Sequence, residues 1–220
     1  MFNRILALIL LIMFLPIMIF ISIIIYITSG FPIIITNRRC GHKFKEFNIY
    51  KFRTMKENNG PLITQSNDSR IIPIGHLLRR YKMDELPQLM NIIRGEMVFI
   101  GPRPEAAEIV KNHNHFFSYL NTIHPGITDI SSVIFKDETQ IININDTEKY
   151  IEEILPLKSL LTNYTLTNYI FLKKSSLFLI SVLSVIHHKL SLRIVSKFFL
   201  PYNEEELRIR LNKLLANDIF

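Results

Sequence analysis

The chain has 220 residues and a net charge of +7, from 26 Lys and Arg against 19 Asp and Glu. Hydrophobic residues make up 48% of it and its mean hydropathy is +0.21. Cys40 is the single cysteine, which excludes an internal disulfide, and no Cys and His spacing resembles a zinc site. A basic chain with apolar stretches near both ends suits an anionic lipid surface or phosphorylated substrates better than nucleic acid.

The first predicted element is an apolar helix over residues 5–27, a stretch without a charged side chain. A straight helix of that length is roughly 33 Å long, whereas the hydrocarbon core of a bilayer is about 30 Å thick. Pro16 removes a backbone donor near its middle and predicts a kink. The segment is long for a signal peptide and has no Ala-x-Ala site, which favours a retained membrane segment.

The charges around this segment leave two topologies open. Arg38, Arg39, Lys43 and Lys45 follow it and indicate that its C-terminal end is cytoplasmic. Arg4 favours the same side for the other end, which a re-entrant helix satisfies and a spanning helix does not.

The middle of the chain alternates short predicted strands and helices. Residues 43–55 predict a strand or hairpin arm, on which Lys51 and Arg53 share one face. Helices are predicted over 74–81, from Asp84 to the Arg94-Gly95 end, and from 105 to about 120, with a short strand over 97–100.

Two neighbouring acids and several cations carry the chemistry of this region. Asp84 is predicted to cap its helix, and Glu85 follows in the first turn. With Arg79 upstream and Arg103 fixed between two prolines, the set suits a site that holds phosphates and a divalent cation. The structural alternatives are an ordinary helix cap and, for Lys51 and Arg53, a solvated strand face.

The C-terminal part is predicted to be helical, first over 147–161 and again in the tail. Basic residues alternate there with Leu, Ile and Phe, which predicts an interfacial helix with His188, Lys189, Arg193 and Lys197 toward lipid headgroups. An ordinary amphipathic helix packed on the domain fits the same pattern.

Several motifs taken together resemble the bacterial sugar transferase family, the monotopic phosphoglycosyl transferases. The matching residues, in chain order, are Lys51-Phe52-Arg53-Thr54-Met55, Asp68-Ser69-Arg70, Ile74-Gly75, Leu78-Arg79-Arg80, Asp84-Glu85-Leu86-Pro87-Gln88-Leu89, Gly95-Glu96-Met97, Gly101-Pro102-Arg103-Pro104-Glu105 and Pro125-Gly126-Ile127-Thr128. The resemblance covers about residues 1–170. The sequence departs from the family pattern after Thr128, where it continues with Asp129-Ile130-Ser131-Ser132-Val133. The chain also contains no Trp.

The resemblance implies transfer of a sugar phosphate from a UDP-sugar to undecaprenyl phosphate, with Mg²⁺ required and UMP released. By that match Asp84 is the nucleophile that forms a phosphosugar-aspartyl intermediate, and Glu85 binds the metal. Arg79 and Arg103 would hold phosphates, and Lys51 and Arg53 match a basic strand motif of substrate binding. The family's anchor, a helix broken at a proline, favours the re-entrant topology at Pro16.

The predicted fold class is therefore mixed α/β and helix-rich: a small monotopic membrane domain with short strands and interfacial amphipathic helices. Its predicted parts are an anchor over 1–30, a catalytic domain over 31–170 and a membrane-associated region over 171–220. We expect the bacterial inner membrane, with the site on the cytoplasmic face, membrane lipids and downstream glycosyltransferases as partners, and no nucleic acid. The alternative function is a catalytically silent scaffold that binds lipid-linked glycans or partner enzymes.

Overall fold

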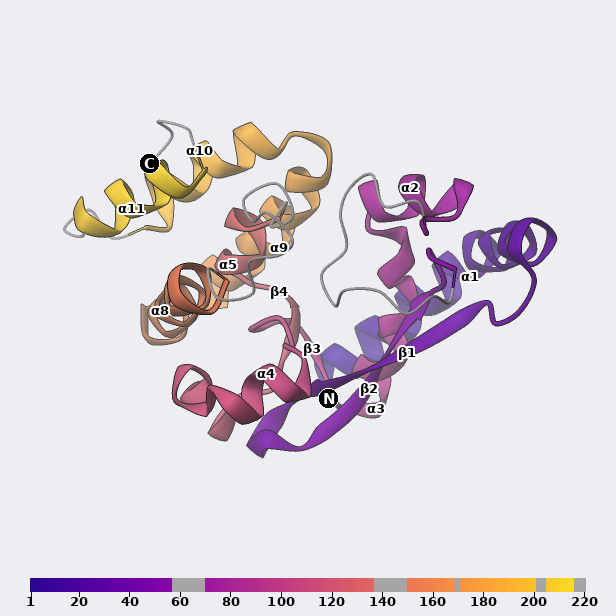
Figure 1. Cartoon of the computed structure of the whole chain (residues 1–220), viewed down its shortest axis with the longest axis horizontal. Coiled ribbons are helices and arrows are strands. Elements are labelled where there is room, and N and C mark those ends of the chain that lie inside the picture. The colour runs from indigo at the N-terminus through magenta and orange to yellow at the C-terminus, as the bar shows by residue number, and fades with distance from the viewer. Residues whose placement is uncertain (57–69, 137–149, 169–170, 201–204, 216–220) are drawn as a thin grey trace. The chain divides into compact units, whose positions relative to one another are not determined.

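The computed structural model describes residues 1–56, 70–136, 150–168, 171–200 and 205–215 (Figure 1). It is a mixed, helix-rich structure with an apolar N-terminal helix and short strands, which confirms these parts of the predicted fold class. The chain divides into two compact units, Met1–Ile127 and Thr128–Phe220, and each is described by itself. The predicted three-part division at residues 30 and 170 stays a prediction.

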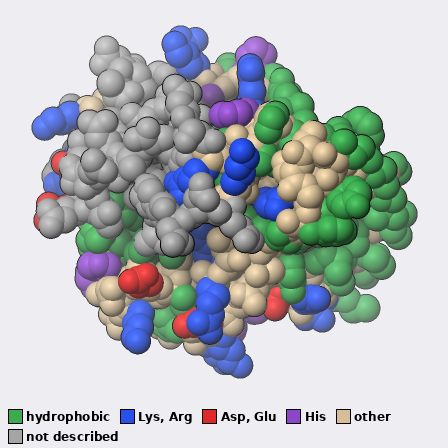
Figure 2. Space-filling model, turned by 45° about the vertical axis from the view of Figure 1, so that its right-hand side comes forward, with side chains coloured by type: hydrophobic (Ala, Val, Ile, Leu, Met, Phe, Trp, Pro, Cys, Tyr) green, Lys and Arg blue, Asp and Glu red, His purple; other side chains and the backbone are tan. Residues whose placement is uncertain are grey.

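Helix α1 (Phe2–Ser29) contains the apolar N-terminal segment, and helical structure is present on both sides of Pro16. Within the described residues it is the one helix long and apolar enough to cross a membrane, and 17% of its most apolar stretch is buried. Figure 2 shows one face of the molecule, with a broad surface of hydrophobic side chains at its right-hand side. Whether the helix spans or returns to its own side stays a prediction.

A hairpin follows α1 and confirms the strand predicted over residues 43–55. Strand β1 (Ile34–Cys40) pairs antiparallel with β2 (Glu46–Phe52), so that Ile34 lies opposite Phe52 and Cys40 opposite Glu46. The short 3₁₀ turn η1 (His42–Phe44) connects the two strands.

The C-terminal half of α1 is part of the core of the first unit. Ile21 and Ile25 pack with Phe52, Ile72 and Leu78 in one buried cluster. Side chains from α1, the end of β2 and helix α2 (Pro73–Arg80) therefore meet there. Apolar burial is worth about 25 cal/mol per Å². This cluster therefore fixes the end of the apolar helix to β2, which carries Lys51 and ends directly before Arg53.

The remaining elements of the first unit are short. They are η2 (Met83–Gln88), α3 (Leu89–Arg94), β3 (Val98–Ile100), α4 (Ala107–Asn112), η3 (Asn114–Asn121) and β4 (Gly126–Thr128), which pairs with β3 and whose last residue belongs to the second unit. The predicted helices over 74–81 and up to Arg94 are present, although the second begins as a 3₁₀ turn. The helix predicted from 105 to 120 is instead interrupted at His113, whose φ of −130° and ψ of 41° are not helical.

Apart from Thr128 at the end of β4, the elements in the described residues of the second unit are helical. They are α5 (Ile130–Ile134), the π-helical turn η4 (Tyr150–Ile154), α8 (Leu155–Asn168), α9 (Phe171–Ile186), α10 (His188–Phe198) and α11 (Glu205–Leu215). Helix α10 buries Leu192 and Val195 and exposes Lys189, Arg193 and Lys197. Its amphipathic pattern is thus present, and its association with a membrane stays a prediction.

Candidate active site

Asp84 and Glu85 lie in the 3₁₀ turn η2, which continues directly into α3. Both side chains are buried, with exposed fractions of 7% and 8%. The prediction that Asp84 caps a helix is wrong: Lys82 occupies the cap position, and no side chain caps the turn. Lys82 has a φ of 56°, a left-handed conformation that is uncommon for a side chain other than glycine or asparagine. The tight turn that it starts brings both acids into the protein interior.

Two cations from separate segments bind Glu85. Arg103 Nη1 donates a hydrogen bond to Glu85 Oε2 at 3.0 Å, and Arg103 Nη2 donates to Oε1. Lys51 Nζ on β2 donates to Glu85 Oε1 at 3.1 Å. The guanidinium uses its planar fork to bind both carboxylate oxygens. The structure therefore brings together Lys51, Glu85 and Arg103, all of them predicted site residues.

The loop that carries Arg103 is attached to the protein on both sides. Gly126 N donates to Pro102 O at 2.8 Å, and Cys40 N donates to Glu105 O at 3.1 Å. A Cβ on Gly126 would lie 2.3 Å from Gly101 N, so the close approach of the two chains requires glycine. The two prolines beside Arg103 restrict their own φ angles, and the hydrogen bonds at Pro102 and Glu105 hold the loop against its neighbours.

Electrostatics distinguish the two neighbouring acids. Burial raises the pKa of Glu85, but the attraction of Arg103, Lys51 and Lys82 outweighs it and holds this pKa well below its usual range. For Asp84, burial and the negative charge of Glu85 raise the pKa, and Lys51, Lys82 and Arg103 oppose them without prevailing. Among the residues that the structure describes, none donates a hydrogen bond to the buried Asp84 Oδ1. Glu85 is thus a neutralised anion, whereas Asp84 keeps an unpartnered oxygen.

The other two predicted basic residues lie on adjacent structure. Arg79 Nε, at the end of α2, donates to the buried Thr54 Oγ1 at 2.9 Å. Arg53 donates from Nη1 to Phe31 O and from Nη2 to the carbonyl oxygens of Ser29 and Gly30. These contacts attach Arg53 to the C-terminal end of α1. A phosphate-binding role for either arginine stays a prediction.

Sequence reasoning missed two residues that shape this site. Lys82 contributes positive charge next to both acids, and its left-handed backbone leaves no mark in the sequence. Asn91 is fully buried in α3, accepts from Tyr50 N at 3.2 Å and donates to Asn48 O at 2.8 Å and to Glu96 Oε2 at 2.7 Å. It joins α3 to β2. In the sequence, an amide side chain close to the apolar Leu89 and Ile92 was the signal that could have pointed to a buried polar residue.

The acid pair fits a hard cation that is bound mainly by its substrate. Among the described residues no group of three or more His, Cys, Asp or Glu side chains could hold a metal ion. Mg²⁺ commonly uses one or two protein carboxylates together with substrate phosphates and water. Glu85, the predicted metal ligand, provides one such carboxylate directly beside Asp84.

Comparison with known proteins identifies the family. Residues 1–163 match the family model described as bacterial sugar transferase. The chain belongs to this family. The match includes α1, the hairpin, the acid pair and the Arg103 loop, and it extends into the second unit. The family resemblance predicted from the motifs is therefore confirmed.

Three curated relatives illustrate the similarity of this sugar transferase family member. One, from Aeromonas hydrophila, is a UDP-N-acetylgalactosamine-undecaprenyl-phosphate N-acetylgalactosaminephosphotransferase, 34% identical over 56% of this chain and 30% of its own. A second, from Xanthomonas campestris pv. campestris, is a UDP-glucose:undecaprenyl-phosphate glucose-1-phosphate transferase, 36% identical over 62% of this chain and 30% of its own. The third is the exopolysaccharide production protein ExoY of Rhizobium meliloti, 30% identical over 59% of this chain and 65% of its own. The chain thus spans less than two thirds of each of these relatives.

Proposed function

We propose that the chain transfers a sugar phosphate from a UDP-sugar to undecaprenyl phosphate, releases UMP, and so initiates the assembly of a bacterial surface glycan. The observation that carries this proposal is the contrast within the acid pair. Glu85 is neutralised by Lys51 and Arg103, whereas Asp84 keeps a buried oxygen without a donor. A carboxylate oxygen that no donor occupies is available to form a bond.

The proposed reaction has two displacements at one phosphorus atom. Asp84 attacks the β-phosphorus of the donor, the bond from that phosphorus to the bridging oxygen breaks, and UMP leaves with the oxygen and its electron pair. A phosphate oxygen of undecaprenyl phosphate then attacks the phosphorus of the acyl phosphate and releases the Asp84 carboxylate. Arg103 and Lys51 would counter the charge of the donor phosphates, and their contacts with Glu85, the neighbour of Asp84, support this role.

The proposed cofactor is Mg²⁺, which Glu85 would bind together with the substrate phosphates. When bound, it would neutralise negative charge on the diphosphate of the donor. Because Glu85 already accepts from Arg103 and Lys51, its charge would be shared between the cation and these two side chains. Glu85 would then hold Arg103 and Lys51 in place as well.

The proposed location is the bacterial inner membrane, with the site on the cytoplasmic face. The apolar α1 supports it, since most of its surface is exposed in the protein alone. Helix α9 adds three exposed apolar side chains, Leu179, Val182 and Ile186, at spacings of three and four residues. The re-entrant, monotopic topology is part of the same proposal.

The test is release of UMP by the purified full chain in detergent, with undecaprenyl phosphate, Mg²⁺ and a panel of UDP-sugars. We expect one or a few sugars to support turnover, and we expect Asp84→Asn to abolish it. Mass spectrometry of a reaction without acceptor should show a sugar-phosphate adduct on Asp84. Undiminished turnover of Asp84→Asn would refute the proposed nucleophile. No UMP release with any donor would favour the scaffold alternative.

A further inference from the structure

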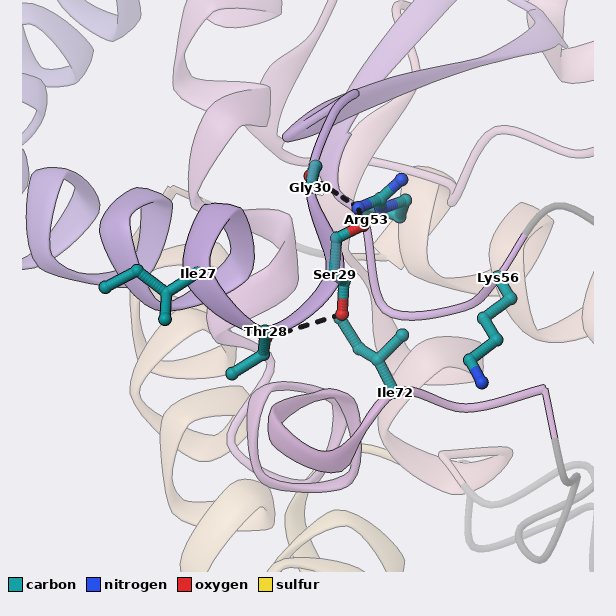
Figure 3. Close-up of a pocket in the computed structure, with 7 residues that line it drawn as sticks. All are labelled: Ile27, Thr28, Ser29, Gly30, Arg53, Lys56 and Ile72. Atoms are coloured by element: carbon teal, nitrogen blue, oxygen red, sulfur yellow. Dashed lines mark hydrogen bonds between the residues drawn. The ribbon is translucent and has the colours of Figure 1, made fainter.

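A pocket of about 480 Å³ lies at the C-terminal end of α1, and the proposed chemistry makes no use of it. Figure 3 shows its lining, which is Ile27, Thr28, Ser29, Gly30, Arg53, Lys56 and Ile72. The lining does not include Asp84, Glu85, Lys51 or Arg103. A ligand in this pocket would therefore lie beside the acid pair and not on it.

The charge of the pocket lining is positive. Of the seven described residues that line it, two are cations and none is an acid. The C-terminal end of a helix normally repels anions, because its last carbonyl groups carry partial negative charge. Here Arg53 donates to the carbonyls of Ser29 and Gly30 and offsets that charge. Arg53 is 6% exposed, and its buried Nε has no hydrogen-bond partner among the described residues. The pocket thus presents a fixed buried cation.

Lys56 provides a second, accessible positive charge. Its side chain is exposed, and within the described residues its Nζ forms no ion pair. In Figure 3 it extends on the opposite side of the pocket from Ile27. The lining thus supplies two cations, Arg53 and Lys56, together with the hydroxyl groups of Thr28 and Ser29.

An apolar surface leads to the pocket along α1. Phe20, Ile23 and Ile27 are 63%, 50% and 75% exposed, and their spacing of three and four residues places them on one side of the helix. Ile27 also lines the pocket. Two exposed aromatic side chains flank the lining residues 27–30 in sequence, Tyr26 at 53% and Phe31 at 73%, and tyrosine is enriched where a membrane meets water.

We propose that this pocket binds the phosphate headgroup of an anionic glycerophospholipid of the bilayer, whose chains lie along Phe20, Ile23 and Ile27. The combination of a cationic pocket with an exposed apolar stripe matches an amphipathic anion rather than a free one. Because the lining excludes the acid pair, the occupant is a lipid of the membrane itself and not the reacting acceptor. A bound headgroup would hold the end of α1 at headgroup depth. Arg53 follows Lys51 by two residues, and Lys51 binds Glu85. The bound headgroup would therefore also fix the depth of Glu85 relative to the bilayer.

The test is binding, so it does not depend on turnover. The full chain, delipidated in neutral detergent, is titrated with dioctanoyl phosphatidylglycerol, dioctanoyl phosphatidylcholine, a short-chain polyprenyl phosphate and inorganic phosphate, and adducts are counted by native mass spectrometry. We expect phosphatidylglycerol to bind at least tenfold more tightly than phosphatidylcholine. Lys56→Gln should weaken that binding about tenfold, a loss of about 1.4 kcal/mol. Lys43→Gln, which changes an exposed lysine in the hairpin turn, should alter it less than twofold.

Asp84→Asn should bind phosphatidylglycerol as tightly as the wild type does. The lipid-binding result is therefore independent of whether Asp84 performs the proposed chemistry. Unchanged binding by Lys56→Gln would overturn the proposal, as would equal weakening by Lys43→Gln. Tight binding of inorganic phosphate that depends on Lys56 would identify a site for free anions instead. Dependence on Lys56 for polyprenyl phosphate alone would assign the pocket to the acceptor, and this too would overturn the proposal.

Discussion

Lys51 Nζ lies 3.1 Å from Glu85 Oε1, and this contact joins the hairpin to the turn that holds the acid pair. Lys51 is half-buried and Glu85 is buried. Burial lowers the pKa of Lys51, and the negative charge of Glu85 opposes that effect. Removal of one partner from such a contact leaves a buried charge uncompensated. The pKa of Glu85 is lowered and that of Asp84 is raised. Neutral substitutions at the two positions should therefore change the stability of the fold in opposite directions.

Glu85→Gln should destabilise the protein at pH 7. The pKa of Glu85 lies below its ordinary value of 4.5 in the folded chain, so its carboxylate stabilises the fold above that pH and loses this effect as the pH falls through the folded pKa. Breaking a buried pair costs about 3 kcal/mol, which lowers Tm by roughly 6–12 °C in a chain of this size. Thermal unfolding in detergent measures the change.

Asp84→Asn should stabilise the protein at the same pH. Because the pKa of Asp84 is raised above 3.8 in the folded chain, its ionised form opposes folding, and the fold loses stability as the pH rises from 3.8 through the folded pKa. The amide removes that charge, so Tm should rise while turnover is lost. A fall in Tm as large as that of Glu85→Gln would contradict the contrast between the two acids.

Lys82→Asn should shift the acidic limb of the pH profile of kcat/KM upward. Lys82 lowers the pKa of Asp84 from outside its hydrogen-bonding shell, so its removal raises that pKa further, and ionised Asp84 forms at a higher pH. Asparagine tolerates the left-handed conformation of position 82, which keeps the turn intact. Lys43→Asn, at another residue with a positive φ of 56°, is the matched control and should leave the profile unchanged.

Gly126→Ala should reduce turnover by about a hundredfold, because displacement of a substrate-positioning group by about 1 Å can cost that much. The added Cβ would lie 2.3 Å from Gly101 N and 2.6 Å from Gly101 Cα. The loop would have to move, and Arg103 with it. Gly41→Ala is the control, since its Cβ meets mainly the ring of Phe47, at 3.0 Å. Equal activity of both variants would show that the position of Arg103 does not depend on the close contact between Gly126 and Gly101.

Local signals in the sequence predicted the hairpin and α2, because alternation and helical periodicity act over short ranges, and the rigid Arg103 loop was expected to face the acids. For Lys51 the pattern also allowed a solvated strand face, and only the family resemblance favoured a place in the site. They could not predict that Asp84 lies inside the turn while Lys82 occupies the cap position, since a left-handed lysine depends on tertiary packing. His113 shows the same limit, for its helical pattern gives no sign of the interruption there. Opposite pKa shifts at two adjacent acids likewise arise from burial and from distant partners.

Arg53 is the predicted site residue whose contacts most clearly allow two roles to be separated. Its two Nη atoms donate to the carbonyl oxygens of Ser29, Gly30 and Phe31 at the end of α1. Arg53→Lys keeps the charge but loses the fork that reaches three carbonyls. If the contact is structural, amide hydrogen exchange at residues 29–34 should accelerate at least tenfold, with the KM for the UDP-sugar unchanged. A raised KM without faster exchange would instead support the phosphate-binding role predicted from the sequence. Lys45→Arg, an exposed substitution on the same hairpin, should change neither quantity.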